Sequence, residues 1–250
     1  MTSGWKASLA LSILMLFSTT LIMVDHSNSI LDDLDNDSEA SPKALTIWSG
    51  NIAVNGDYTV AAGDELRVLN GTNIQMGPGV RIYVEGKLSV QGTSANPVNM
   101  TIQTGFIWHD GIQFNSTSRN RGSVVQHMNI SDAQFGFTIY DSNPVIEDVY
   151  FDNVDLVGID LFNGANPVIR RATFQDGGQD VHGAMTNWRY GIGLSVGAGS
   201  APYVEDVTFT NQITRSISFW GNSGGVFRDI DVSETGGATM NISAAVFVED

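Results

Sequence analysis

The sequence predicts an all-β protein, a single-stranded right-handed parallel β-helix in which each turn of about 22 residues contributes three short strands. Three observations predict this fold. A nine-residue motif recurs, its apolar residues fall at the same positions in each copy, and a second strand-like segment follows each copy. The copies begin at Gly122, Asn143, Asn166, Ala201 and Gly224. Because similarity at a regular spacing marks stacked repeats, each copy should form part of one turn.

Three apolar columns appear when the copies are aligned. Members of a column should stack about 4.8 Å apart and form the core of the solenoid. The first column holds Val125, Ile146, Ile169, Val204 and Phe227, the second Met128, Val149, Ala172, Val207 and Ile230, and the third Ile130, Phe151, Phe174, Phe209 and Val232. The first two columns lie three residues apart, which strand alternation does not allow. A corner is therefore predicted between them, at pairs such as Glu147 and Asp148.

The segment after each copy begins at Gly136, Gly158, Gly191 or Ser216. Its alternation predicts two further inward columns and two outward columns. The inward columns are Phe137, Ile159, Ile192, Ile217 and Ile139, Leu161, Leu194, Phe219. The outward columns are Thr138, Asp160, Gly193, Ser218 and Tyr140, Phe162, Ser195, Trp220.

Corner residues alternate in charge from one copy to the next. Glu147, Arg170, Glu205 and Arg228 occupy one position in successive copies. Because exposed ion pairs contribute only about 0 to 1 kcal/mol each, we interpret this alternation as support for the register rather than as a functional site.

The N-terminal region, residues 1–29, is predicted to direct export. Lys6 precedes a mostly apolar run of 18 residues from Ala7 to Val24, and Asp25 follows it. A helix of this length would extend about 27 Å, so the segment is either a cleaved signal peptide or a retained signal-anchor. Both alternatives place the rest of the chain outside the cytoplasm. Residues 30–43 are acidic and contain Pro42, which indicates a flexible linker.

Residues 44–250 are predicted to form the β-helix. Its first part has short alternating strands, and Leu66 and Leu88 repeat the period. The order from Asp57 to Val98, followed by WHDGIQF from Trp108, resembles the opening turns of secreted and surface right-handed β-helix repeat proteins of the pectate-lyase-like superfold. This resemblance covers roughly residues 45–250. It implies the fold, while that superfold includes polysaccharide lyases, glycoside hydrolases, adhesin-like surface proteins and passive scaffolds.

Composition excludes several kinds of site. The 250 residues carry a formal net charge of −15 and contain no cysteine. The sequence therefore has no disulfide framework and no thiolate metal site, and its acidity argues against nucleic acid as a partner.

Six Asn-x-Ser/Thr sequons predict glycosylation if the source cell modifies exported proteins. The alternative is that these asparagines are unmodified residues of turns and outer faces. The sequons begin at Asn36, Asn70, Asn99, Asn115, Asn129 and Asn241.

Catalysis has few candidate residues. The resemblance implies that substrates lie along the outer face of one strand stack, where Asp160 is the one carboxylate of its column, whereas glycoside hydrolysis needs two. An insertion of the sequence QDGGQDVHGAMTNWRY, residues 175–190, adds Asp176, Asp180 and His182. These residues could bind calcium, or Asp180 and His182 could act as an acid and base pair, but neither set has a recognised ligand spacing. We therefore expect no cofactor and no metal.

Binding has stronger candidates. Tyr140, Phe162 and Trp220 should display aromatic rings along one face, next to Trp188 and Tyr190 of the insertion. Exposed aromatic side chains of this kind often mark binding sites, and sugar rings stack on them. In the alternative interpretation a neighbouring loop covers the three rings.

The sequence therefore predicts an exported β-helix that serves as a surface or extracellular scaffold and binding module, contacts glycans and is not catalytic. A polysaccharide lyase or glycoside hydrolase of the same fold is the alternative, favoured if further acids lie near Asp160. A purely structural protein is the third, favoured if the aromatic face is covered. Ala245, Phe247 or Val248 should continue the repeat, so further turns or a partner are expected to cover that end.

Overall fold

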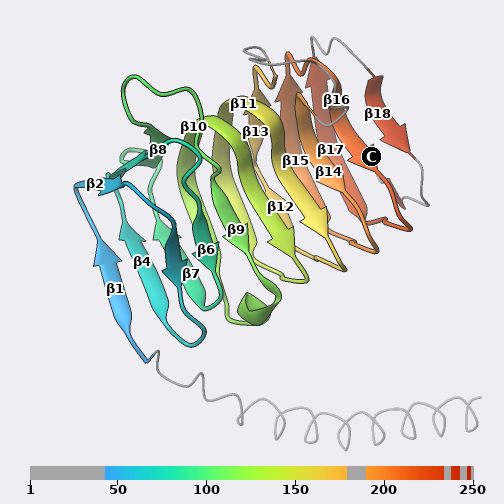
Figure 1. The fold of residues 1–250 in the computed structure, drawn as a ribbon. Coiled ribbons are helices and arrows are strands. Elements are labelled where there is room, and N and C mark those ends of the chain that lie inside the picture. Colours follow the sequence, from blue (N-terminus) through green and yellow to red (C-terminus); the bar gives the residue numbers. More distant parts are fainter. Residues whose placement is uncertain (1–42, 179–189, 234–237, 243–246, 249–250) are drawn as a thin grey trace, which may run out of the picture. The chain divides into compact units, whose positions relative to one another are not determined.

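The computed structural model describes residues 43–178, 190–233, 238–242 and 247–248. They all lie in the unit Pro42–Asp250 and form a parallel β-helix of about eight turns with coils roughly 23 residues apart. Figure 1 shows the turns side by side, from β1 at one end to β18 near the other. The predicted right-handed β-helix is confirmed. Residues 1–42, with Asn36, and residues 179–189, with Asp180, His182 and Trp188, lie outside the described residues.

Three parallel sheets make up the walls of the solenoid. The first sheet contains β1 (Leu45–Trp48), β4 (Glu65–Leu69), β7 (Lys87–Gln91), β12 (Val168–Arg170) and β19 (Phe247–Val248). The second contains β2 (Asn51–Val54), β5 (Asn73–Met76), β8 (Val98–Ile102) and β13 (Thr173–Gln175). The third contains β3 (Tyr58–Val60), β6 (Ile82–Val84), β9 (Ile112–Phe114), β14 (Ile192–Val196), β16 (Arg215–Phe219) and β18 (Ala238–Ile242).

Four longer strands bend from one sheet into the next. β10 (Val124–Tyr140) and β11 (Val145–Phe162) run through all three sheets, and β15 (Tyr203–Thr210) and β17 (Val226–Ser233) run through the first two. A short 3-10 helix, η1 (Ser116–Ser118), follows β9. Among the described residues no helix is long and apolar enough to cross a membrane.

The corners lie where the sequence predicts them. Asp148 and Arg171, in the predicted corner pairs, have φ values of 55° and 50°, in the left-handed region. The next corner in each turn uses residues such as Asp132 and Asn153, with φ values of 57° and 51°. Asp and Asn tolerate this conformation better than most residues do, so they suit these corners, and Arg171 is the exception among the four residues named here.

The predicted charge ladder forms at the first corner. Arg170 Nη1 lies 3.4 Å from Glu147 Oε1 in the preceding turn, and its Nε lies 3.1 Å from Glu205 Oε2 in the following turn. Arg171 makes a bidentate pair with Asp148 at 2.8 and 2.9 Å. These side chains are partly exposed, so the ladder contributes to register more than to stability.

The first three apolar columns form the core, as predicted, except that Ile230 and Val232 of the last turn are only partly buried against it. Val125, Ile146, Ile169, Val204 and Phe227 are partners in register and are fully buried. The pairing of Val226 and Phe227 with Phe247 and Val248 extends the repeat, as predicted.

A phenylalanine stack runs through the third column. Phe151 and Phe174 are stacked with centroids 4.6 Å apart, and Phe174 and Phe209 with centroids 4.8 Å apart. All three side chains are at most 2% exposed. Buried aromatic side chains on adjacent turns therefore join the turns along the axis of the solenoid.

Glycines in the third sheet leave the space that these rings occupy. A Cβ added to Gly158 would lie 2.5 Å from the Phe174 ring, closer than real Cβ atoms approach other atoms. The same contact recurs in the adjacent turns. The pairs are Gly136 with Phe151, Gly158 with Phe174, and Gly193 with Phe209.

The predicted alignment of the third sheet is wrong in one turn. Ile159 pairs with Leu194 rather than Ile192, and Leu161 pairs with Val196 rather than Leu194. The inward columns are therefore Phe137, Ile159, Leu194, Ile217 and Ile139, Leu161, Val196, Phe219. The reason is steric, because the glycine opposite Gly158 has to leave room for Phe209, and Gly193 does so.

Loss of one ring should destabilise the solenoid. We expect Phe174→Ala to cost about 3 to 5 kcal/mol, because the substitution removes a buried ring and leaves a cavity between two neighbouring rings. Urea unfolding followed by circular dichroism measures this cost. The adjacent Thr173→Ala, on the outer side of the same strand, is the control and should change stability by about 0.5 kcal/mol or less. Equal effects of the two substitutions would contradict the assignment of this column.

Filling the glycine column should also destabilise the protein. We expect Gly158→Ala to cost about 1 to 3 kcal/mol, because its Cβ would lie 2.5 Å from the Phe174 ring and 2.7 Å from Gly193 O. Gly56→Ala is the control, since a Cβ at Gly56 would meet no atom within 4 Å. In the double variant Gly158→Ala, Phe174→Leu, the smaller side chain should restore part of the loss, which unfolding of all four proteins would measure. Strictly additive losses would exclude the proposed steric conflict.

Candidate functional site

A pocket lies at the corner between the second and third sheets. Ser89 pairs with Val124, 35 residues later, whereas Arg67 pairs with Ser89, 22 residues later. Part of the additional chain is the loop 103–111 between β8 and β9. This loop helps to form a pocket of about 420 Å³, a volume in the ~300 to 1,000 Å³ range of small-ligand sites. Its lining residues are Pro78, Gly79, Gly105, Phe106, Ile107, Trp108, Asp110 and Gln134.

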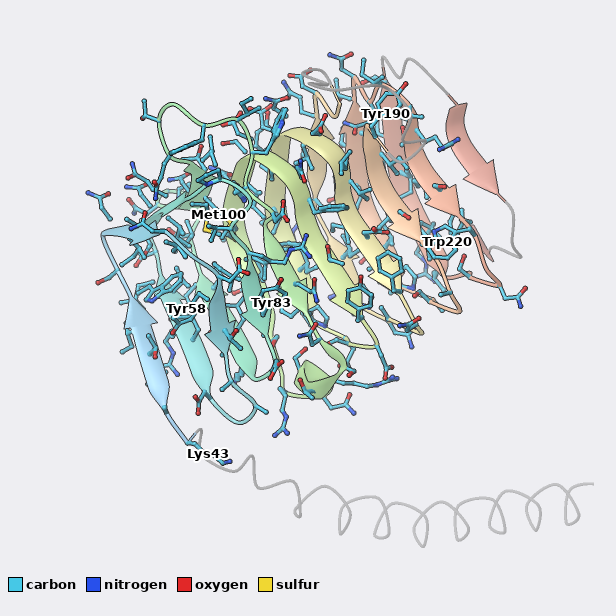
Figure 2. The ribbon with its side chains drawn as sticks, in the orientation of Figure 1. Lys43, Tyr58, Tyr83, Met100, Tyr190 and Trp220 are labelled. Atoms are coloured by element: carbon cyan, nitrogen blue, oxygen red, sulfur yellow. The ribbon has the colours of Figure 1, made fainter. Side chains whose placement is uncertain are left out.

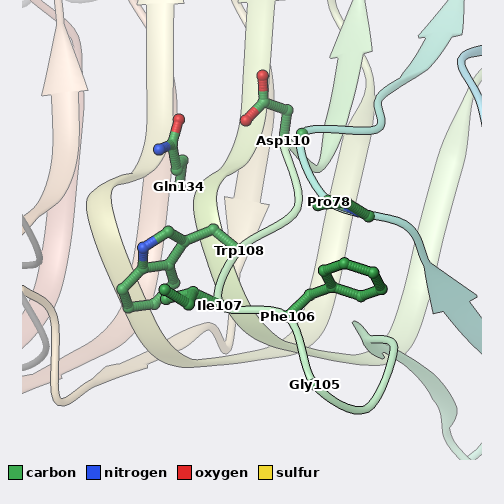
Figure 3. A pocket seen from close by; sticks show the side chains of 8 residues that line it. Pro78, Gly105, Phe106, Ile107, Trp108, Asp110 and Gln134 are labelled. Atoms are coloured by element: carbon green, nitrogen blue, oxygen red, sulfur yellow. The ribbon is translucent and has the colours of Figure 1, made fainter.

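One side of the pocket is apolar and open to solvent. Phe106 and Ile107 are 50% and 51% exposed, and Trp108 is half-buried. Figure 3 shows these three side chains on one loop, with Pro78 on the adjacent connection. Large apolar side chains that gather at the surface commonly mark a binding site.

The other side of the pocket is polar. Asp110 Oδ2 lies 3.3 Å from Arg81 Nη2, and Arg81 Nη1 donates to Gln113 Oε1 at 2.7 Å. Burial raises the pKa of the Asp110 carboxyl, as Asp57 also does, while Arg81 lowers it. The half-buried Gln134 amide lies on the same side (Figure 3). The pocket therefore offers an anchored carboxylate and an amide beside an aromatic surface.

Backbone hydrogen bonds hold the loop on its neighbours. Gly79 N–H donates to Trp108 O at 3.1 Å, and Asp110 N–H donates to Val80 O at 2.9 Å. These bonds attach the loop to the preceding turn. The pocket is therefore formed before a ligand arrives, which lowers the entropic cost of binding.

His109 lies between Trp108 and Asp110 in the pocket loop and is fully buried. Its Nδ1 accepts a hydrogen bond from Gly111 N–H at 3.0 Å, and its Nε2 lies 3.1 Å from Ser131 O, to which it donates. The ring is therefore neutral, with the proton on Nε2. Burial lowers the pKa of His109 from 6.5 to about 4, although the Ser131 hydrogen bond and the Asp132 carboxylate raise it.

The structure brings three of the predicted aromatic residues together on the third sheet. Tyr140 and Phe162 are stacked with centroids 4.8 Å apart, and Phe162 meets Trp220 edge to face at 5.7 Å. Trp220 lies over Gly197, where a Cβ would lie 2.0 Å from the indole, and its Nε1 donates to Ser195 Oγ at 3.2 Å. All three rings are half-buried.

This aromatic column differs from an open platform. The ring faces between Tyr140 and Phe162 cover each other, so a sugar could use only the remaining faces and edges. Tyr190 lies apart from the column, at the opposite end of the third sheet from Trp220 (Figure 2), where its carbonyl accepts a hydrogen bond from Thr214. The assignment of these residues to glycan binding stays a prediction.

Asp160 is placed differently from the expectation. Its register partners are Thr138 and Ser195, so Ser195 replaces Gly193 in the first outward column, and Gly197 takes the place of Ser195 in the second. The Asp160 side chain is only 1% exposed. In the described part of this column no second carboxylate accompanies it, so the paired acids of a glycoside hydrolase are not assembled there.

Asp176 lies at the start of the insertion. Of the three residues of the insertion that were candidates for a metal or catalytic site, it is the one within the described residues. Its Oδ1 accepts from Asn211 Nδ2 at 2.6 Å, and its Oδ2 accepts from Gln175 Nε2 at 3.1 Å. Among the described residues no group of three or more acidic, histidine or cysteine side chains could hold a metal ion. The calcium alternative therefore gains no support from this part of the chain.

Two sequons lie within an asparagine ladder on the second sheet. Asn129 Nδ2 donates to Asn99 Oδ1 at 2.9 Å, and Asn99 Nδ2 donates to Asn73 Oδ1 at 3.1 Å. A glycan would be attached to the same nitrogens. Asn70, by contrast, lies exposed on a turn.

The two remaining sequons within the described residues lie elsewhere. Asn115 accepts from Gln113 Nε2 at 2.8 Å, and Asn241 pairs with Ser218 in the third sheet. Glycosylation of every sequon stays a prediction.

The pocket is the feature that the sequence did not predict. Its loop lies in the stretch WHDGIQF and the residues before it, for which the resemblance implies only the fold. One signal was present, because Phe106, Ile107 and Trp108 are three consecutive large apolar residues in a stretch without strand alternation, preceded by Gly105. Such a run has no place in a core column and therefore indicates a surface loop.

The predicted insertion of residues 175–190 begins at the corresponding corner, at the end of β13. It connects β13 of the second sheet with β14 of the third, as the loop 103–111 connects β8 with β9. Counted along the sequence between the described strands, these are the two longest connections from the second sheet to the third.

Comparison with protein-family models and with curated proteins identifies no relative. The chain matches no protein-family model, and no curated protein is significantly similar to it. Function is therefore argued from the fold and from the geometry of the pocket.

His109 should make the protein sensitive to acid. Its pKa in the folded protein, about 4, lies below the unfolded value of 6.5, so the unfolded state binds the proton more readily. Stability from this group is complete above about pH 6.5 and falls as the pH approaches 4, by about 3 kcal/mol. Urea unfolding between pH 7 and pH 4 measures the loss of stability. The His109→Gln variant should not show the part of this loss that protonation of His109 causes. His127→Gln is the control at a partly exposed histidine, and identical pH profiles for all three proteins would contradict the assignment.

Proposed function

We propose that this chain is an exported, non-catalytic β-helix scaffold that binds a neutral glycan in the pocket beside the loop 103–111. The observation that carries the proposal is the exposed aromatic loop beside an anchored carboxylate and an amide. A sugar ring has an apolar face of C–H groups and a rim of hydroxyl groups. Phe106 and Trp108 offer surfaces for the first, and Asp110 and Gln134 offer hydrogen-bonding groups for the second.

Charge favours a neutral ligand over an anionic one. The chain carries a formal net charge of −15, so its field opposes the approach of polyanions such as pectate. Arg81 is the positive group next to the pocket, and it is already engaged by Asp110 and Gln113. An uncharged polysaccharide fits this setting better than an acidic one.

Export and a place at the cell surface form part of the proposal. They are supported by the apolar N-terminal run from Ala7 to Val24 and by the several sequons. A long, narrow solenoid with a binding loop on one corner suits a protein that holds a polymer outside the cell.

Retention on insoluble neutral polysaccharides tests the proposed function. Protein without residues 1–42 is applied to cellulose, chitin, xylan and starch, and retained protein, reducing ends and unsaturated ends are measured together. We expect retention on at least one polymer without released products. Trp108→Ala and Phe106→Ala should weaken binding about tenfold or more, equivalent to about 1.4 kcal/mol or more, because each removes a ring that contacts the sugar.

Two control variants show which surface is used. Ile47→Ala removes an exposed apolar side chain from β1 and should leave retention unchanged. Trp220→Ala probes the aromatic column in the same assay. A loss confined to Trp220→Ala would assign binding to that column instead of the pocket, and released products would identify a lyase or hydrolase.

A further inference from the structure

We propose that His109 is the positioning residue of the pocket, a buried imidazole whose two hydrogen bonds hold the wall formed by Trp108 and Asp110 against the wall formed by Gln134. This inference rests on the proposed function for its biological meaning, because a positioned wall matters if a ligand binds there. It concerns a different property, the way in which the fold builds the site and responds to pH.

The two hydrogen bonds of the ring join different parts of the chain. Nδ1 accepts from Gly111 N–H at 3.0 Å, within the pocket loop, and Nε2 donates to Ser131 O at 3.1 Å, in β10 of the following turn. The imidazole therefore links the end of the loop to the next turn of the solenoid. Because the ring is fully buried, water cannot replace either bond without opening the loop.

The backbone of His109 makes the same connection. Its N–H donates to Asp132 O at 3.3 Å, and its O accepts from Gln134 N–H at 2.8 Å. Trp108 and Asp110, the neighbours of His109 in sequence, both line the pocket, as does Gln134. The position of one residue therefore sets the separation of the two walls.

Gly111 has no substitute at the point where the ring is anchored. Its φ is 66°, and an added Cβ would lie 2.1 Å from Phe135 O. The loop therefore passes close to β10 at this point, and the Gly111 N–H is directed at the imidazole. The Gly111 N–H has this hydrogen-bond partner only while Nδ1 of His109 carries no proton and can accept.

Protonation of the ring would break this arrangement. A proton on Nδ1 would face the Gly111 N–H, so two donors would oppose each other in a buried space. Among the described residues, the charged group that acts on the ring is Asp132 on β10. Asp110, the next residue in the loop, is paired with Arg81 of the preceding turn. Asp132 favours the charged ring, whereas burial opposes it more strongly.

Amide hydrogen exchange resolved by NMR tests the inference without any ligand, so its outcome is separate from that of the polysaccharide assay. The protein without residues 1–42 is compared at pH 7, 6, 5 and 4. The readouts are the protection of the Gly111 amide, corrected for the intrinsic effect of pH, and the indole resonance of Trp108, assigned with Trp108→Phe. The Asn115 amide, which donates to Val84 O at 2.9 Å, reports any general unfolding.

We expect protection of Gly111 to fall at least tenfold between pH 6 and pH 4 while Asn115 stays protected, and the Trp108 indole resonance should shift over the same range. In His109→Gln, whose amide can accept from Gly111 and donate to Ser131, both readouts should be independent of pH. In His109→Leu, protection of Gly111 should be lost at least tenfold already at pH 7.

Asp110→Asn separates the carboxyl from the imidazole, because Asp110 also titrates in acid. The loss of Gly111 protection should persist in this variant. The inference is overturned if Gly111 protection in the natural protein does not change with pH, if His109→Gln follows the natural pH profile, or if the change disappears in Asp110→Asn. It is also overturned if His109→Leu keeps full protection of Gly111 at pH 7.

Discussion

The close contact between the phenylalanine stack and the glycine column determines how successive turns fit together. Phe174 lies between Phe151 and Phe209 and occupies the space that Gly158 leaves empty. Changing either partner alone lowers stability. A smaller side chain at Phe174 leaves a cavity, and any side chain at Gly158 collides with the Phe174 ring. This constraint fixes both the stacking of turns and the register of the third sheet.

The same column explains why the pocket lies where it does. Gly111 precedes β9, whose Ile112 pairs with Phe137, and so it occupies the glycine position of its own turn. Here no phenylalanine fills the space, and the backbone of β10 approaches instead, with Phe135 O next to Gly111. The pocket loop therefore ends at Gly111, a position where the repeat requires close packing. A rigid solenoid with loops at one corner can present a binding site without a movable part.

Much of the fold could be predicted from the sequence because it follows from alternation. Columns such as Val125 to Phe227 and corners such as Asp148 require only that apolar and polar residues recur with the period of the turn. The register near Ile192 could not be obtained this way. Gly191 and Gly193 both suit the glycine position by sequence, and only the contact with the Phe209 ring, which depends on packing across sheets, decides between them.

The candidate site was harder to predict, because periodicity describes what the turns share and a site is where one turn differs. The alternation did identify Tyr140, Phe162 and Trp220 as neighbours, yet their mutual contact could not be read from it. Phe106 and Trp108 occupy positions that do not recur from turn to turn, and their exposure depends on how the loop crosses the preceding turn.

Among the described residues that line the pocket Asp110 is the one carboxylate, and Arg81 holds it in place. A carboxylate fixed in this way suits the orientation of a hydroxyl group better than the transfer of its proton, because proton transfer by a pair of acids needs a second carboxyl group opposite the first. The fixed position of the Asp110 carboxylate therefore supports the proposed recognition of a ligand in the pocket.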